Sequence, residues 1–206
     1  MSPLPNKTRP LDDILLKLSR LGVTSEIQQK IGAFGVCWGL FEAHLESVVW
    51  LLNGESVSGV HPSTDRTPIS EWISKLSAGH PSLSDEANKV LAVASKAAVH
   101  LMHYRHSLFH GMLVPFPDGA PMFIRNPRWN GELRKRKSGS ASVGDNLLDL
   151  AIESAWTLVD VNITVQKIMR SEISMASLER LKTKVNRAKS MSCELHLTAS
   201  MNHEKY

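Results

Sequence analysis

Cysteine and long apolar runs are both scarce in this chain of 206 residues. Cys37 and Cys193 stand far apart and form no metal-binding pair, and so low a cysteine content favours a reduced, cytoplasmic location. No apolar stretch approaches the roughly 18–20 residues that a membrane helix needs. Residues 1–10 also lack the apolar core of a secretory signal. We therefore expect a cytoplasmic protein with no membrane partner.

Several well-known catalytic and nucleotide-binding motifs are absent as well. The sequence contains no Gly-x-Ser-x-Gly, no Gly-x-Gly-x-x-Gly and no phosphate-loop signature. We expect no cofactor. Acidic residues are only slightly outnumbered, with 24 basic and 20 acidic side chains and a net charge of +4. This modest excess is compatible with a nucleic-acid partner but does not require one.

Apolar residues recur at helical spacing in three long segments, 25–52, 84–110 and 142–169. In the first segment the steps of three and four residues are carried by Phe34, Trp38, Phe41, Leu45, Val48 and Leu52. This pattern predicts an all-α protein, a helical bundle of one main domain. Shorter helices are expected over 11–21, 68–78 and 174–190.

The helical pattern is interrupted after Gly111. Two apolar stretches within 112–125 flank a Pro-Asp-Gly turn and predict a small β-hairpin, whose prolines favour edge strands. We expect no other strand, and we expect the basic, Ser- and Gly-rich residues 126–141 to be mobile. The predicted organisation is a lead-in with a short helix over 1–24, a helical domain over 25–190 with the hairpin and basic loop at about 112–141, and a flexible tail over 191–206.

The most informative motif lies at the predicted end of the helix over 84–110, in the run Tyr104-Arg105-His106-Ser107-Leu108-Phe109-His110-Gly111. Arginine binds phosphate and histidine transfers protons near neutral pH, so the pair indicates chemistry on a phosphodiester. On an ideal helix, however, Arg105 and His110 point about 140° apart. They meet only if the last turn unwinds, if the long arginine bends around the helix, or if a second copy completes the site.

Two other interpretations of this run stay open. In the first, Arg105 forms a salt bridge and His110 caps its helix, where a cation is favourable. In the second, His106 and His110 share a metal ion on a helix face that also carries His100 and His103. No acid or cysteine stands at a characteristic ligand spacing, which makes a solvated histidine face a simpler explanation than a metal site.

The run Arg105-His106-Ser107-Leu108-Phe109-His110 resembles the arginine–polar residue–spacer–histidine motif of HEPN domains, which are mainly helical bundles. The long helices before and after it match the same pattern, and the resemblance covers roughly residues 30–170. Many members of that family are metal-independent ribonucleases that work as dimers. Others are toxins paired with an antitoxin protein, and some bind nucleotides or are inactive.

The resemblance implies RNA cleavage by attack of the 2′-hydroxyl on the adjacent phosphorus, without a metal. His110 is then the general acid or base, Arg105 stabilises charge on the phosphoryl oxygens, His106 assists, and Glu42 holds Arg105 in place. The basic segment 125–137 grips the RNA backbone. A homodimer is expected because the helix over 84–110 is apolar on two sides. The alternative is a non-catalytic dimeric adaptor, or a module that binds nucleotides or RNA.

Overall fold

The computed structural model describes residues 10–116, 119–128, 131–133, 135–136, 138–144 and 146–201. The expectations for the lead-in over 1–9 and for the last residues, 202–206, lie outside this part of the chain. So do Arg134 and Lys137 of the basic segment, and Asp145, which was one expected start of the third long helix.

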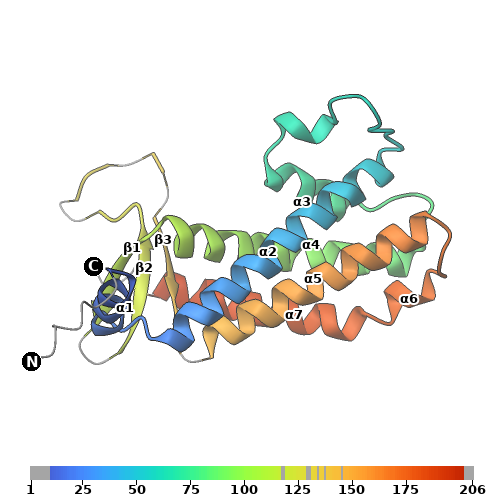
Figure 1. Ribbon diagram of the computed structural model, residues 1–206. Coiled ribbons are helices and arrows are strands. Elements are labelled where there is room, and N and C mark those ends of the chain that lie inside the picture. Colours follow the sequence, from blue (N-terminus) through green and yellow to red (C-terminus); the bar gives the residue numbers. More distant parts are fainter. Residues whose placement is uncertain are drawn as a thin grey trace, which may run out of the picture.

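Four long helices lie side by side along most of the molecule (Figure 1). They are α2 (Ser25–Leu52), α4 (Asp85–His110), α5 (Leu147–Met169) and α7 (Lys182–Met201). Helix α2 packs mainly on α5, α4 packs mainly on α7, and α5 also contacts α7. A small sheet and helix α1 (Pro10–Arg20) lie at one end of these helices, whereas α3 (Ile69–Ala78) and the 3-10 helix η1 (Ser63–Arg66) lie away from it.

The ends of the two best-predicted helices follow from local sequence signals. The Thr24 side chain accepts a hydrogen bond from the backbone N–H of Ile27 at the start of α2, and the Ser84 hydroxyl accepts one from Ala87 at the start of α4. Gly111 follows the last residue of α4. The predicted boundaries 25–52 and 84–110 are therefore confirmed to within one residue.

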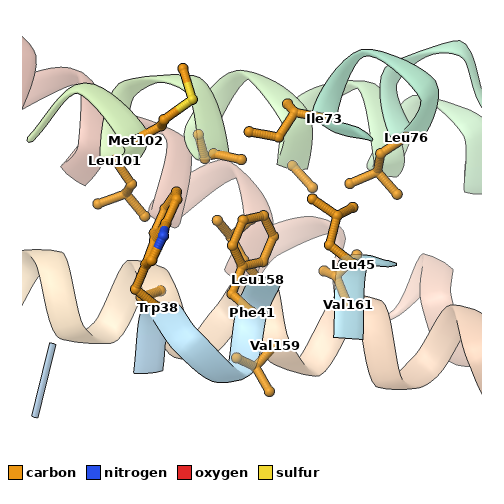
Figure 2. Packing of buried hydrophobic residues seen from close by; sticks show 14 of the residues in the cluster. Trp38, Phe41, Leu45, Ile73, Leu76, Leu101, Met102, Leu158, Val159 and Val161 are labelled. Atoms are coloured by element: carbon orange, nitrogen blue, oxygen red, sulfur yellow. The ribbon is translucent and has the colours of Figure 1, made fainter. Parts of the chain in front are cut away.

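The core lies between α2, α4 and α5, with α3 covering part of it (Figure 2). The alternating steps of the α2 stripe place Trp38, Phe41 and Leu45 in the interior, each at most 2 % exposed. They meet buried residues of the other helices, including Leu101 of α4 and Leu158 of α5. The all-helical prediction thus holds for the main body of the protein.

The sheet is larger than predicted. Strands β1 (Met112–Phe116) and β2 (Gly119–Arg125) form the expected antiparallel hairpin, with Leu113 opposite Phe123. A third strand, β3 (Gly139–Ser142), pairs antiparallel with β2, so the expectation of a single hairpin followed by a mobile loop is wrong at 139–142.

The order β1–β2–β3 also makes β2 a central strand rather than an edge strand. Pro121 is tolerated there because the pairing between β2 and β3 begins one residue later, at Met122. Although Pro121 has no N–H to donate, its carbonyl accepts a hydrogen bond from the backbone N–H of Val143.

The C-terminal part of the fold corrects two further expectations. The predicted helix over 174–190 is divided into a short α6 (Ala176–Glu179) and the long α7, which continues to Met201. The expected flexible tail from residue 191 is therefore wrong as far as 201. Helix α7 persists because Met191, Ser192 and Leu195 are buried, Leu195 at only 2 % exposure. Helix α5 starts at Leu147, since Ser142, the other expected start, belongs to β3.

Candidate active site

Arg105 and His110 meet within one chain at the end of α4. Arg105 Nη1 lies 3.3 Å from His110 Nε2. Helix α4 stays regular as far as His110, so the last turn has not unwound. Of the three routes considered for bringing the pair together, the structure therefore uses the length of the arginine, which bends around the helix.

Phe109 guides that bend. The Arg105 guanidinium lies over the Phe109 ring, with 5.7 Å between its central carbon and the ring centroid. Phe109 in turn stacks on Phe34 of α2, with an interplanar angle of 12°. The arginine is thus directed by an aromatic ring that the hydrophobic core holds in place.

The 3.3 Å contact between Arg105 and His110 is a hydrogen bond in only one state of the imidazole. A guanidinium has only donors and is always charged, so Nε2 of His110 must be the acceptor. An accepting Nε2 belongs to a neutral imidazole whose proton is on Nδ1. This is the form in which histidine acts as a general base. His110 is exposed and Arg105 is half-buried, so a substrate can reach the pair.

His106 lies one turn before His110, with 6.0 Å between the two ring centroids. Its pKa falls from the ordinary 6.5 to about 4, first because of burial and then because of the charges of Arg105 and Arg125. At neutral pH this ring is uncharged. It can therefore orient a substrate group by hydrogen bonding, but it is a poor source of charge for a phosphate.

Glu42 does not take the place expected for it. Its Oε1 accepts a hydrogen bond from Trp38 Nε1, four residues earlier on α2, at 2.5 Å. Within the described part of the chain no ion pair joins Glu42 to Arg105. The expected positioning role is corrected: Trp38 holds the carboxylate, and Phe109 rather than Glu42 contacts the guanidinium.

A cavity of about 290 Å³ lies beside the motif and was not foreseen from the sequence. Helix α4 contributes His100 and His103, β2 contributes Arg125, and α7 contributes His196. The sequence interpretation missed it because His196 fell in the expected tail. The spacing of Val185, Ala188, Ser192 and Leu195 is helical, and it is the signal that could have extended α7 far enough to include His196.

A metal site finds no support in this arrangement. Among the residues that the structure describes, no group of three or more His, Cys, Asp or Glu side chains is arranged to hold a metal ion. His106 and His110 are neighbours, but no described His, Cys, Asp or Glu joins them as a third ligand. Over the same described ranges, none of the helices has the length and apolar character needed to cross a membrane.

Comparisons with known proteins add no relative. A scan against protein-family models, a search of curated proteins and a search of solved structures each found no match. Function must therefore be argued from the Arg105–His110 pair and its surroundings.

Proposed function

We propose that this protein is a metal-independent endoribonuclease of HEPN type. The observation that carries the proposal is the 3.3 Å contact between Arg105 Nη1 and His110 Nε2 at an exposed helix end. It places a fixed positive charge beside a histidine nitrogen that can accept a proton once the guanidinium turns to the phosphate. Both are needed for attack of a hydroxyl on a phosphodiester, and neither requires a metal.

The reaction assigns one role to each residue. His110 Nε2 removes the proton from the ribose 2′-hydroxyl, the 2′-oxygen forms a bond to phosphorus, and the bond from phosphorus to the 5′-oxygen breaks. The 5′-oxygen takes up a proton, and the products are a 2′,3′-cyclic phosphate and a free 5′-hydroxyl. Arg105 stabilises the charge that develops on the phosphoryl oxygens. Because Nε2 has a single lone pair, Arg105 must turn from Nε2 to the phosphoryl oxygens before Nε2 can take the 2′-hydroxyl proton.

A homodimer is part of the proposal. The proposed dimer patch consists of exposed apolar side chains of α2, α4 and β1: Val36, Leu40, Phe109 and Met112, which are 65, 39, 43 and 50 % exposed. The two helices meet here, because a Cβ built on Gly35 would lie 3.2 Å from the Phe109 ring. Pairing two copies through this patch removes it from water and brings both motifs to one cleft. The second copy's histidine is then available to protonate the leaving 5′-oxygen.

The patch also favours the second candidate, a non-catalytic dimeric adaptor or a nucleotide- or RNA-binding module. Such a module needs the interface but no proton acceptor at His110. If the chain is a nuclease, its proposed setting is a toxin or defence protein restrained by an antitoxin, as the family resemblance implies.

Cleavage of single-stranded RNA in the presence of EDTA tests the proposal. The wild-type protein should yield 2′,3′-cyclic phosphate ends, and Arg105→Ala and His110→Ala should abolish them while remaining folded. Matched controls are His61→Ala and Arg170→Ala, because both side chains are exposed and neither belongs to the motif. Cleavage that survives both motif substitutions contradicts the proposal. A folded wild-type dimer that leaves a broad panel of RNAs intact favours the adaptor.

A further inference from the structure

The cavity beside the motif has the chemistry of an anion site. Its walls come from α4, β2, β3 and α7, and its polar lining includes His100, His103, Ser107, Arg125, Ser140 and His196. No Asp or Glu of the described residues lines it. The fixed charge of Arg125 and the lack of a carboxylate in the lining give the cavity positive potential and favour a negatively charged ligand, to which the imidazoles can donate hydrogen bonds.

Two nitrogen atoms of the cavity residues lack partners. His100 Nδ1 and Arg125 Nε are buried, and neither has a hydrogen-bond partner among the described residues. Buried donors are normally satisfied, and leaving one unmade is unfavourable. Arg125 can only donate, so the group that satisfies its Nε must be an acceptor.

The cavity is kept open by Gly139 of β3. A Cβ at this position would lie 2.8 Å from Ser107 Oγ and 3.5 Å from Arg125 Nη2. The strand backbone therefore approaches these two groups closely, and any side chain at 139 would occupy the space in front of them. Position 139 therefore requires glycine because a side chain would clash, and not because of an unusual backbone angle.

The cavity also contains groups suited to the remainder of a nucleotide. His196 lies against His100 and His103, with ring centroids 4.9 and 6.2 Å apart, and imidazole faces stack on nucleobases. Donors arrive from α4, β2 and α7, which suits the several oxygens of a tetrahedral anion better than a planar carboxylate. Burial, with smaller contributions from His196 and Lys189, lowers the pKa of His100, so this ring meets a ligand as a neutral hydrogen-bonding group.

We infer that this cavity is a phosphate-binding pocket in which Arg125, Ser107 and His100 hold the phosphate group of a nucleotide unit. The ligand is either a free mononucleotide or an internal phosphodiester of RNA, which share this chemistry. The inference concerns binding alone and stands whether or not Arg105 and His110 cleave RNA.

Isothermal titration calorimetry with the full chain tests the pocket. The probes are inorganic phosphate, adenosine 5′-monophosphate, and a 2′-O-methyl dinucleotide whose phosphodiester cannot be cleaved by the proposed reaction. We expect binding of at least one nucleotide probe, and Arg125→Gln should weaken it at least about tenfold. Preference for the monophosphate assigns the site to free nucleotides, and preference for the dinucleotide assigns it to the RNA backbone. The matched control is Arg170→Gln, an exposed arginine at the end of α5 that does not line the cavity, and it should bind as wild type does.

A second measurement keeps the test independent of folding defects in a variant. In the wild-type protein, imidazole nitrogen resonances of His100 and His196 should shift on titration with the bound probe, whereas those of exposed His61 should not. Gly139→Val should block binding while motif residues stay unchanged. The inference is overturned if no probe binds at millimolar concentration, if Arg125→Gln binds as tightly as wild type, or if the His100 and His196 resonances stay fixed while a probe binds.

Discussion

Coupling between Arg105 and His110 offers the sharpest test of the proposed chemistry. The guanidinium donates to the imidazole at 3.3 Å, so each residue helps to position the other before substrate binds. Loss of a general base costs about 10²–10⁴-fold in rate. Loss of a charge-stabilising donor costs roughly 10²–10³-fold. Independent effects would multiply, and the double variant would lose about 10⁴–10⁷-fold.

We expect the double variant Arg105→Ala/His110→Ala to lose no more than the worse single variant. Residues that act as one unit are strongly non-additive, because removing either one already disables the step that both serve. Arg105→Lys should recover little of the lost rate. It restores a charge but not the planar guanidinium that stacks on Phe109 and donates to His110.

The assay is single-turnover cleavage of a fluorescently labelled RNA in EDTA, with substrate saturation checked for every variant. Single-turnover rates separate the chemical step from product release. Additive losses in the double variant would show that the two residues act separately and would refute the coupling. Full recovery by Arg105→Lys would show that charge alone suffices, against the argument from guanidinium geometry.

Three further predictions concern stability and assembly. Leu195→Ala should lower the free energy of unfolding by about 2–5 kcal/mol in chemical denaturation because Leu195 is only 2 % exposed, whereas Leu197→Ala, at a position 55 % exposed, should change it far less; equal effects would contradict the packing of α7. Unfolding free energy should fall as pH drops from 6.5 toward 4, since His106 resists protonation only in the folded state, and His106→Asn should flatten that slope; an unchanged slope would contradict the assignment. Val36→Asp should convert the proposed dimer to a monomer in light scattering, and a wild-type protein that is already monomeric at micromolar concentration would count against the dimer.

Hydrophobic periodicity predicted the long helices well because it is sustained over many turns. In α2 the stripe from Phe34 to Val48 leaves only one face for the core, and capping residues mark where α2 and α4 begin. In α2 and α4 the hydrophobic stripe and the capping residues indicate the same helix, and the tertiary packing leaves that helix unchanged.

The missed elements are those that tertiary contacts create. Strand β3 is Gly-Ser-Ala-Ser, which has none of the β-branched or aromatic residues typical of strands. It is stabilised from outside: Tyr104 Oη donates to the Ser142 carbonyl at 2.8 Å, and Ser140 Oγ donates to the Ala199 carbonyl at 3.1 Å. These partners lie 38 and 59 residues away, so no local pattern could indicate them.

In the candidate site, too, local geometry predicted the backbone positions but not the side-chain contacts. Helical geometry correctly places the Cβ atoms of Arg105 and His110 about 140° apart, and on that ground alone the pair looked separated. The contact depends on the reach of an arginine and on a phenylalanine that steers it, which backbone angles do not contain. Glu42 was expected to contact Arg105, but its carboxylate instead accepts a hydrogen bond from Trp38 on the same helix.

Helix α4 carries residues of both the proposed catalytic motif and the proposed phosphate pocket. Its end carries Arg105 and His110, while His100, His103 and Ser107 face the pocket, so a ligand in the pocket and a phosphodiester at the motif would be held by one rigid element. The charge of Arg125 acts on both sites, since Arg125 lines the pocket and also lowers the pKa of His106. An anion bound at Arg125 would offset that charge and raise the pKa of His106 in part, because burial and Arg105 would still hold it down. Occupancy of the pocket would thereby be coupled to the pKa of a residue beside the proposed base, without any movement of the helix.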